Sequence, residues 1–425
     1  MTTSSDAKFP IIAYISQWFP PESSGPSLWI AQALAASGFN VKVITAIPNY
    51  PKGVVFPGYK AWRVKKEKLH DMDTLHCPIY PSHDHSALKR MVNYSSFAIT
   101  SILFGMKICK GADAILVYSS PATSALPAMT ANLVFKRPYV LFIQDLWPDT
   151  VMQSGMLKGN KAGKVVGNLL GRFDRVSTLR AAHIIVISQG MKKALISRGV
   201  PESKITVIHN WVDEDAVKPV KRTGELRGQL SVPESDLLFM YAGNHGIVQG
   251  LHDWISAVAS VQDLENVHFV FIGDGAEKQR LEARASQLAL KRIHFLDPVG
   301  ALEFSTIAAE ADAQIISLRN EPLFEITIPG KVQSSLAKDM AVLGSVQGDA
   351  AVLLSESGAG IIAAPEDPAG IELIIRQAHA EGADALALRG VAGGEYYRQT
   401  MSAERGSRMT ASVMNRVLGL VSVSE

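Results

Sequence analysis

The stretch Leu237-Leu-Phe-Met-Tyr241-Ala-Gly243-Asn244-His-Gly246-Ile-Val-Gln249-Gly250-Leu251 joins an apolar run to a glycine-rich turn and the start of a helical segment. A continuous apolar run of this length is typical of a strand buried on both faces in a parallel sheet. Such sheets bind ligands beyond the carboxyl ends of their strands, where glycine lets backbone amides approach a diphosphate. The stretch therefore predicts an α/β domain with an anion-binding turn that includes Gly243, Asn244 and Gln249.

Short apolar runs alternate with helix-length segments twice along the chain, which predicts two parallel sheets covered by helices on both faces. In the first half, we expect strands at 10–16, 41–47, 112–119, 138–145, 183–188 and 205–210. In the second half, we expect strands at 237–244, 267–275, 293–297, 313–318, 341–346 and 360–364.

The fold class that follows is α/β, with two Rossmann-like parallel-sheet domains facing across a cleft. We expect an N-terminal domain at residues 1–215 and a C-terminal domain at 216–394. The polar, strand-poor segment 213–230 is the expected linker, and residues 395–425 have helical spacing.

Composition places the chain among large globular proteins of a reducing compartment. It has 425 residues, of which 47% are apolar, and only two cysteines, Cys77 and Cys109. Two cysteines are too few for a disulfide framework, and such a low cysteine content suits the cytoplasm. The N-terminus lacks the pattern of a signal peptide, and the apolar stretch 97–108 is too short to span a bilayer. We therefore expect a cytoplasmic protein.

The two halves of the chain carry opposite charge. Residues 1–218 contain 25 Lys and Arg against 14 Asp and Glu, whereas the remainder contains 17 against 26, giving +11 and −9. A basic cluster at 60–68 includes Tyr59 and Trp62 among or beside its charges, which fits a membrane interface. A solvated basic face is the alternative interpretation. Nucleic acid is not an expected partner, because no zinc-ligand spacing or RNA-binding motif accompanies the charge.

The segment Glu325-Ile-Thr-Ile-Pro329-Gly330-Lys331-Val-Gln333-Ser334-Ser-Leu-Ala337 is typical of an anion socket at a helix start. Proline suits the first helical turn, glycine lets a ligand approach the backbone, and Lys331 adds positive charge beside unpaired N–H groups. A substrate that carries phosphate is the expected ligand. The turn Gly273-Asp274-Gly275 also ends a strand, although glycine serves purely structural needs in many such turns.

Two segments of the first half follow strands in the same way. Gly25, in the proline-rich segment 18–27, can bring backbone close to a phosphate or a sugar. Asp145 closes a buried strand, where a parallel sheet places catalytic groups, and Asp149 either joins it or caps the next helix.

Taken as an ordered set, these motifs resemble those of glycosyltransferase family 4, a retaining family with the GT-B fold. The resemblance covers nearly the whole chain and is greatest to bacterial transferases of colanic-acid-type and fucosamine-type surface polysaccharides. It depends on the following segments: Pro20-Pro21-Glu22 with Gly25, Gln144-Asp145-Leu-Trp147-Pro148, His209-Asn210-Trp211-Val-Asp213, Tyr241 to Leu251, Gly273-Asp274-Gly275 and Pro329-Gly330-Lys331.

The family implies transfer of a sugar from a nucleotide diphosphate sugar, usually a UDP-sugar, without a bound metal or other cofactor. The donor is expected on the C-terminal domain, with its base and ribose near 273–275 and the helix at Pro329. The acceptor is expected on the N-terminal domain as a saccharide on a polyprenyl diphosphate, at the inner face of the plasma membrane. The resemblance also implies that helix 395–425 packs on the N-terminal domain. His83-Asp84-His85 and the acid pair Asp71 and Asp73 are interpreted as solvated loop residues rather than metal ligands.

The chain departs from the family pattern at its charged positions. Asn244 and Gln249 occupy the places of an arginine and a lysine that neutralise the diphosphate, so Lys331, helix N-termini and Arg319 are expected to take over that charge. Glu325 keeps the position of the first of two family glutamates, the one directed toward the donor sugar, and the resemblance implies that it is catalytic. Gln333 or Ser334 replaces the second, which holds ribose hydroxyls.

For the reaction itself, Asp145 is the expected group that orients or deprotonates the acceptor hydroxyl. Three other functions fit parts of the sequence: a UDP-sugar epimerase of the same fold, a non-catalytic sugar-nucleotide-binding partner, and a nicotinamide dehydrogenase.

Overall fold

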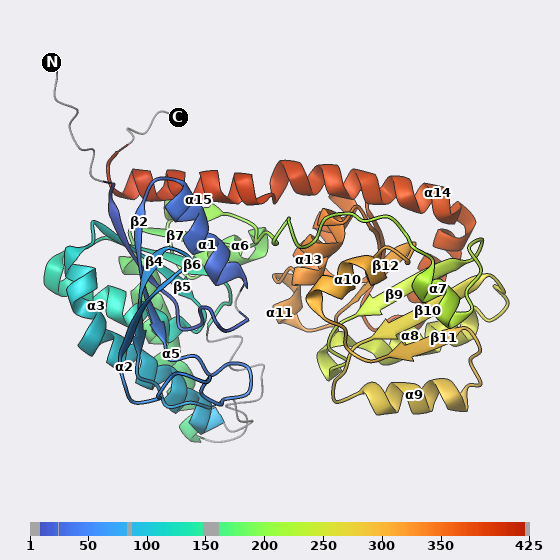
Figure 1. Cartoon of the computed structure of the whole chain (residues 1–425), viewed down its shortest axis with the longest axis horizontal. Helices are drawn as coiled ribbons and strands as arrows, with labels where there is room; N and C mark the ends of the chain where they lie inside the picture. Colours follow the sequence, from blue (N-terminus) through green and yellow to red (C-terminus); the bar gives the residue numbers. More distant parts are fainter. Residues whose placement is uncertain (1–8, 24, 83–86, 148–160, 421–425) are drawn as a thin grey trace, which may run out of the picture. The chain divides into compact units, whose positions relative to one another are not determined.

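The computed structural model describes residues 9–23, 25–82, 87–147 and 161–420, and it divides the chain into two compact units. Unit 1 comprises Met1–His209 together with Ala403–Glu425, and unit 2 comprises Asn210–Ser402 (Figure 1). Each unit is built on one sheet, so both expected parallel-sheet domains are present.

Unit 1 contains an eight-stranded sheet in the order β3-β4-β2-β1-β5-β6-β7-β8. All neighbouring strands are parallel except β3 and β4. Its strands are β1 (Ile11–Ile15), β2 (Asn40–Ala46), β3 (Lys65–Leu69), β4 (Met72–Cys77), β5 (Ala114–Ser119), β6 (Tyr139–Ile143), β7 (His183–Val186) and β8 (Ile205–Val207). The six strands expected in this half are confirmed.

The edge hairpin β3–β4 was not predicted from the sequence. Its strand Lys65–Leu69 is almost entirely charged, and only β4 contributes buried side chains. An exposed edge strand needs no apolar face, and lysines there discourage pairing with another chain. The hairpin therefore gives no apolar signal of the kind used to predict the other strands.

Helices cover the sheet of unit 1, with α1 packed against α15 and α2 against α3. Helix α2 comes so close to the sheet that a Cβ at Gly105 would lie 3.0 Å from Ile44 Cδ1. The helices are α1 (Gly25–Ala36), α2 (Ala87–Gly111), α3 (Ala125–Phe135), α5 (Lys161–Arg180), α6 (Gln189–Ser197) and α15 (Ala403–Val417), with short 3-10 turns η1 (Ala122–Ser124) and η2 (Glu202–Lys204).

Unit 2 contains a fully parallel six-stranded sheet in the order β11-β10-β9-β12-β13-β14. Its strands are β9 (Leu237–Ala242), β10 (Val267–Ile272), β11 (Ile293–Leu296), β12 (Ala313–Ser317), β13 (Ala341–Ser345) and β14 (Gly360–Ala363). All six strands expected in this half are confirmed. In the register of β9 and β10, Ala242 pairs with Ile272, so the two strands end side by side.

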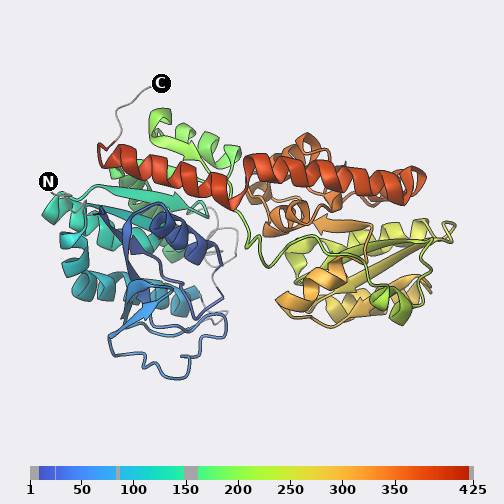
Figure 2. The ribbon, with the colours of Figure 1, turned by 45° about the horizontal axis from the view of Figure 1, so that its top comes forward.

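The helices of unit 2 enclose an aromatic core in which Trp254 is fully buried and donates a hydrogen bond to Ser345 Oγ at 2.8 Å. The long helix α14 packs on α8, α12 and β13 and extends along one side of the unit (Figure 2). The helices are α7 (Glu225–Leu230), α8 (Leu251–Ser260), α9 (Lys278–Gln287), α10 (Ala301–Ala308), α11 (Pro322–Glu325), α12 (Gly330–Ala337), α13 (Gly348–Glu356) and α14 (Pro368–Thr400), with the 3-10 turn η3 (Ile247–Gln249).

The helical segment expected from residue 395 is divided in the structure. Residues up to Thr400 complete α14 in unit 2, and α15 in unit 1 begins at Ala403. The expected boundary at 215 also lies six residues after the division of the chain at His209.

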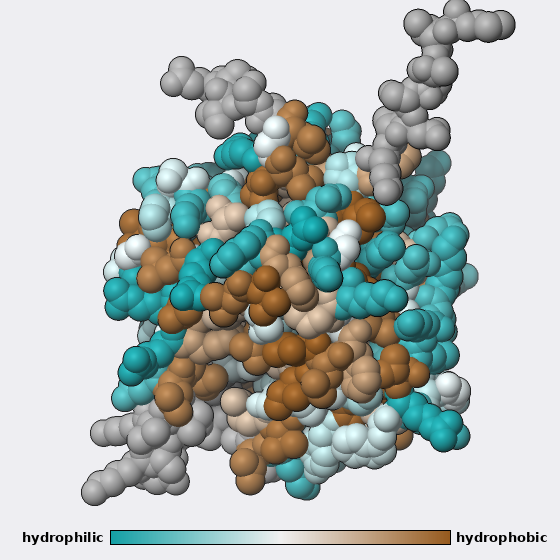
Figure 3. Space-filling model, turned by 90° about the vertical axis from the view of Figure 1, so that its left-hand side faces the viewer, coloured by the Kyte–Doolittle hydropathy of each residue, from teal (hydrophilic) through white to brown (hydrophobic). Residues whose placement is uncertain are grey.

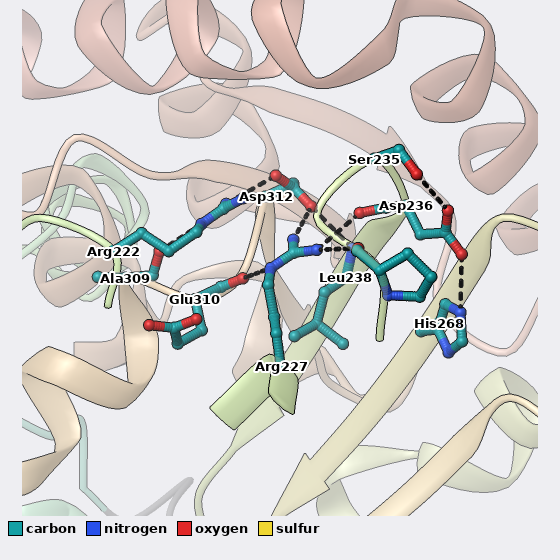
Figure 4. Close-up of polar contacts among 10 residues, drawn as sticks. Arg222, Arg227, Ser235, Asp236, Leu238, His268, Ala309, Glu310 and Asp312 are labelled. Carbon is teal, nitrogen blue, oxygen red and sulfur yellow. Dashed lines mark hydrogen bonds and ion pairs between the residues drawn. The ribbon is translucent and has the colours of Figure 1, made fainter. Parts of the chain in front are cut away.

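The segment 213–230 is not entirely a free linker, because several of its polar side chains bind to the rest of unit 2. Arg227 is buried and donates to Asp312 at 2.7 Å and to the carbonyl of Glu310 at 3.0 Å, while Arg222 donates to Asp312 at 2.8 Å (Figure 4). Arg227 also donates to two loop carbonyls, of Pro233 and Asp236. The last residues of the expected linker are thus held by a partly buried hydrogen-bond network, whereas most of the polar residues before them are exposed.

Among the described residues, no helix is long and apolar enough to cross a membrane. Cys77 and Cys109 are both buried and free.

Candidate active site

Two glycine-rich turns pack backbone against backbone where β9 and β10 end. The amide of His245 donates to the carbonyl of Asp274 at 2.8 Å, and the amide of Gly243 donates to that of Ile272 at 2.9 Å. Gly273 has φ +142°, and a Cβ there would lie 1.9 Å from the Gly243 carbonyl oxygen. Gly275 has φ +155°, and its Cβ would lie 2.5 Å from the His245 carbonyl oxygen. The packing of the two turns therefore requires both glycines, independently of any ligand that the turns bind.

Gly243 makes room for the side chain of Lys331. A Cβ at Gly243 would lie 2.7 Å from Lys331 Cε and 2.8 Å from its Nζ. The Nζ atom lies 3.7 Å from the centroid of the Tyr241 ring, a favourable cation–π contact. The structure thus brings the lysine of the predicted anion socket directly beneath the predicted anion-binding turn.

Lys331 is a half-buried cation for which the described residues provide no carboxylate. Burial lowers the pKa of its ammonium group to about 7, and no charged side chain offsets this effect. Removing an ammonium group from water without an opposite charge is costly, so such a site favours the binding of an anion. The position of Lys331 is thus suited to a phosphate.

The N-terminus of α12 adds further positive potential beside Lys331. Pro329 precedes the helix without a side-chain cap, and Gly330 is exposed with no atom within 4 Å of its would-be Cβ. The first N–H groups of a helix have no partner within it, and they carry the positive end of the helix dipole. An anion can therefore reach the backbone of α12 at Gly330.

A cavity of about 190 Å³ extends from Lys331 along α12. A second lysine, Lys338, lies one turn beyond Ser334, donates to Ser334 Oγ at 3.0 Å and lies 4.7 Å from the ring centroid of Phe304. Burial lowers the pKa of Lys338 to about 8. Among the described residues none of the lining side chains is acidic; they are Ala242, Phe304, Gln314, Gly330, Lys331, Ser334, Ser335, Lys338 and Met340. The cavity is therefore electropositive.

The sequence did not indicate Lys338 as a site residue. It is seven residues after Lys331, a spacing that returns to the same face of a helix, and this spacing was the available signal. His245 was also missed. Its side chain is buried with no hydrogen-bond partner for either ring nitrogen among the described residues, and burial lowers its pKa to about 4. A neutral imidazole therefore lies next to the turn.

Other predicted donor residues lie apart from Lys331 or have their polar groups engaged. Arg319 donates to Glu366 at 2.8 Å and lines a separate cavity of about 320 Å³ near Gly250. The side chain of Gln249 accepts from the amide of Gly246 at 3.1 Å, which stabilises the turn itself.

Three more predicted donor residues and Glu325, which was predicted to be catalytic, have contrasting surroundings. The side chains of Asn244 and Glu325 are exposed, and Asp274 is exposed with Oδ1 accepting from the Gly275 amide at 2.8 Å. Gln333 is buried, and its Oε1 has no hydrogen-bond partner within the described ranges. Gln333 does not line the cavity of Lys331, although Ser334 does. Sequence spacing alone could not decide whether Gln333 or Ser334 faces the cavity. In the structure, the turn of α12 places Ser334 in the cavity lining and Gln333 outside it.

In unit 1, Asp145 lies two residues after the end of β6 and is half-buried. Ser120 Oγ donates to Asp145 Oδ2 at 2.9 Å, and burial raises the pKa of the carboxyl group. Gly25 is the first residue of α1, and a Cβ there would lie 2.6 Å from Trp29 Cζ2, so the indole requires glycine. Pro148 and Asp149 lie outside the described residues.

An aromatic row runs beside Asp145 at the strand ends of unit 1. Ring centroids are 5.6 Å apart for Trp18 and Tyr50, 6.4 Å for Trp18 and Tyr94, and 6.0 Å for Tyr94 and Trp147. The rings come from four separate segments that follow or flank the parallel strands. They form a mixed apolar and polar surface of the kind that binds a ring-shaped ligand.

As for metal binding, no group of three potential ligand side chains that could hold an ion is found within the described ranges. Asp71 and Asp73 are exposed, and His83, Asp84 and His85 lie outside those ranges.

Comparisons with known proteins agree with this arrangement. The family model described as "Glycosyl transferase 4-like domain" matches residues 27–211, and the one described as "Glycosyl transferases group 1" matches residues 236–380. The putative colanic acid biosynthesis glycosyl transferase WcaI of Escherichia coli (strain K12) is 29% identical over 75% of this chain and 79% of its own length. The probable glycosyltransferase WbjE of Pseudomonas aeruginosa is 27% identical over 65% and 69%.

Solved structures show the same fold. Sucrose-phosphate synthase from Thermosynechococcus elongatus matches with a TM-score of 0.74 at 16% identity, over 97% of this chain and 100% of the other. Anabaena HepE in complex with UDP matches with a TM-score of 0.70 at 15% identity, over 96% and 100%. Two parallel-sheet units of this kind form the GT-B fold, and the two family models make the chain a glycosyltransferase.

Within that class, the chain belongs to glycosyltransferase family 4. The resemblance deduced from its motifs, including that to transferases of bacterial surface polysaccharides, is thereby confirmed.

Proposed function

We propose that this glycosyltransferase transfers a sugar from a UDP-sugar to a saccharide acceptor during the synthesis of a cell-surface polysaccharide, with retention at the anomeric carbon. The observation that carries the proposal is Lys331, a half-buried ammonium group at a helix N-terminus for which the described residues provide no carboxylate. Relatives support it: WcaI is named for colanic acid biosynthesis, and HepE was solved with UDP and with UDP-glucose.

The donor diphosphate is assigned to Lys331, the first amides of α12 and the turn at Gly243. These groups stabilise the charge that develops on UDP as the bond between the sugar carbon and the phosphate oxygen breaks. Ser334 and Lys338 line the adjoining cavity, where they can donate hydrogen bonds to ribose hydroxyls. The diphosphate charge is thereby assigned to protein groups, and the proposal includes no metal or other cofactor.

The acceptor is assigned to unit 1, with the aromatic row as its saccharide surface. Trp18, Tyr50 and Tyr94 are half-buried, so each ring keeps part of its face accessible. Asp145 is assigned to the acceptor hydroxyl, which it orients and from which it accepts the proton as the new glycosidic bond forms. Because the pKa of Asp145 is raised, it is a better proton acceptor than a solvated aspartate.

A lipid-linked saccharide on a polyprenyl diphosphate is the proposed acceptor. The net charge of +11 on residues 1–218 suits both the diphosphate of such a lipid and an anionic membrane surface. The protein is accordingly proposed to work as a peripheral protein on the inner face of the plasma membrane.

A transfer assay tests the proposal. Purified protein is incubated with a panel of UDP-sugars labelled in the sugar and with a membrane extract that contains lipid-linked saccharides. We expect label in the lipid fraction, and we expect Lys331→Met to abolish this transfer. The control Lys291→Met, which removes an exposed lysine of the same unit, is expected to retain it.

Other outcomes identify other functions. An epimerised free UDP-sugar without labelled lipid indicates an epimerase. UDP-sugar binding that depends on Lys331 without turnover on any acceptor indicates a non-catalytic binding partner. Either result contradicts the proposed transfer.

A further inference from the structure

A buried carboxyl group lies beside the loops that carry the aromatic row of unit 1. Glu22, in the loop between β1 and α1, is 5% exposed, and it has no part in the transfer proposed above. Glutamate side chains are rarely buried in this way unless hydrogen bonds or an opposite charge compensate for the lost water. The hydrogen-bond partners of Glu22 therefore indicate what it holds in place.

Glu22 joins two loops at the strand ends of unit 1. Its Oε1 atom accepts hydrogen bonds from the amide of Asn49 and, at 2.8 Å, from the amide of Tyr50, both in the segment that follows β2. Burial raises the pKa of Glu22 to about 7, and Oε1 can accept these bonds whether or not the group is ionised. The amide of Glu22 donates to the carbonyl of Phe19 at 3.2 Å, which closes a turn directly after Trp18. Glu22 thus connects the loop of Trp18 to the loop of Tyr50.

This connection fixes the first two rings of the aromatic row relative to each other. The rings of Trp18 and Tyr50 have centroids 5.6 Å apart and planes inclined at 44°, and both side chains are half-buried. An aromatic pair of this kind contributes only modest energy by itself. Because Glu22 holds the amide of Tyr50 beside the turn that follows Trp18, the angle between the rings depends on Glu22.

Buried amide side chains hold the third ring in a similar way. Gln17 is 1% exposed and donates from Nε2 to Asn93 Oδ1 on α2 at 2.8 Å. Asn93 is 3% exposed and donates to the carbonyl of Tyr80 at 2.7 Å. Trp18 follows Gln17, Tyr94 follows Asn93, and the centroids of these two rings are 6.4 Å apart. Buried hydrogen bonds thus position both neighbours of Trp18 in the row.

Exposed apolar surface alone does not distinguish the aromatic row. Figure 3 shows apolar side chains (brown) on another side of unit 1, the one that lies at the left in Figure 1. Elsewhere in the unit, Leu133 and Val134 of α3 are 53% and 63% exposed. Folded proteins commonly expose such residues. The aromatic row differs because its rings come from separate loops that buried polar side chains hold together.

We infer that Glu22 is a positioning residue of the acceptor site, which sets the angle between Trp18 and Tyr50 so that the two rings form one rigid surface for a saccharide. A surface that is ordered before binding gives higher affinity, because ordering loops and side chains on binding costs free energy. Glu22 touches no substrate in this assignment and acts through Tyr50. The inference rests on the proposed function, because it requires the aromatic row to bind the acceptor.

A purely structural role for Glu22 is the alternative, and it predicts a different result. Loss of a structural carboxylate lowers stability, whereas loss of a positioning residue also raises the KM for the acceptor while the protein is folded. Asp113 provides the matched comparison. Its carboxylate accepts from the amide of Ile11 at 2.8 Å, at the opposite ends of the strands of unit 1.

Transfer kinetics of the full-length protein test the inference, with a membrane extract titrated as the source of acceptor. Glu22→Ala should raise the KM for the acceptor about tenfold, which corresponds to about 1.4 kcal/mol, without changing kcat or the KM for the UDP-sugar. Glu22→Gln, whose amide oxygen can accept the same two bonds, should restore most of this loss. Asp113→Ala should leave the KM for the acceptor unchanged. Circular dichroism shows that each variant is folded at the assay temperature.

A double-mutant cycle shows whether Glu22 acts through the ring of Tyr50. Tyr50→Leu alone should raise the KM for the acceptor, and adding Glu22→Ala should raise it less than twofold further. Hydrogen exchange measured by mass spectrometry reports the loop directly. The segment that contains Asn49 and Tyr50 should exchange faster in Glu22→Ala than in the original protein and remain protected in Glu22→Gln. Glu22→Asp shortens the side chain by one methylene and should also raise the KM, so it replaces Glu22→Ala if that variant does not fold.

Three results overturn the inference. The first is an unchanged KM for the acceptor in folded Glu22→Ala or Glu22→Asp, and the second is an equal rise in Asp113→Ala. The third is full additivity of Glu22→Ala and Tyr50→Leu. Transfer by the original protein together with any of these leaves the proposed function standing. Absence of transfer by the original protein contradicts the proposed function, and the inference is then rejected with it.

Discussion

Lys331 should make the affinity for UDP depend strongly on pH just above neutrality. Its pKa in the free protein is about 7, and a bound diphosphate favours the charged form and raises that pKa. The binding energy of the charged lysine is therefore fully present below pH 7 and is lost as the pH rises. From pH 7 to 8.5 the charged fraction falls from about one half to about 3%, which lowers affinity by about 15-fold.

Isothermal titration calorimetry with UDP at several pH values measures this effect, and buffers of different ionisation enthalpy report the proton taken up on binding. Two nearby groups are accounted for: His245 has a pKa of about 4 and stays neutral in this range, whereas Lys338, with a pKa of about 8, titrates within it. Lys338→Met should therefore keep a slope due to Lys331. Lys331→Arg, whose guanidinium cannot lose its proton, should keep only the slope due to Lys338, and the double variant Lys331→Arg with Lys338→Met should give a flat profile. If the UDP affinity of the original protein stays constant within twofold from pH 7 to 8.5, the charged form of Lys331 does not bind the diphosphate.

Three further predictions concern stability and the reaction. Arg227→Met should lower the free energy of unfolding by about 3–5 kcal/mol, because it leaves Asp312 buried without its closest partner, and urea titration with Arg222→Met as the milder control measures this. Gly273→Ala should destabilise unit 2 by more than about 2 kcal/mol, because its Cβ overlaps the Gly243 carbonyl. The control Gly330→Ala meets no atom and should unfold like the original protein. A smaller effect at Gly273 contradicts the packing of the turns. Asp145→Asn should lower the rate of transfer by about 100-fold or more without changing UDP affinity, and an unchanged rate excludes Asp145 as the proton acceptor.

The strands that could be predicted from sequence are those buried on both faces. Runs such as Leu237–Ala242 and Val267–Ile272 are continuously apolar, so composition alone identifies them. The β3–β4 hairpin escaped because its outer strand is charged at four of five positions. In the segment 213–230, polarity did not distinguish the exposed residues of the expected linker from those that enter a buried hydrogen-bond network, such as Arg227.

The sequence predicted those parts of the candidate site that depend on a short local pattern with a single structural interpretation. Pro329-Gly330-Lys331 indicated a cation at a helix start, and the structure places Lys331 beside Gly243 as that interpretation requires. The roles of Gly273 and Gly275 depend on contacts between two turns about 30 residues apart in sequence, which no local pattern reveals. His245 becomes a candidate only because its buried ring nitrogens have no partner among the described residues, and burial is a property of the folded unit. For Lys338 the spacing from Lys331 was a signal in the sequence, but its burial becomes known only from the fold.

The assignment of Lys331 to the donor diphosphate is tested most directly by a crystal structure of the protein with bound UDP. We predict that a phosphate oxygen lies within hydrogen-bonding distance of Lys331 Nζ and of an amide in the first turn of α12. A structure in which UDP occupies unit 2 while Lys331 Nζ remains on the Tyr241 ring, without contact to phosphate, contradicts it.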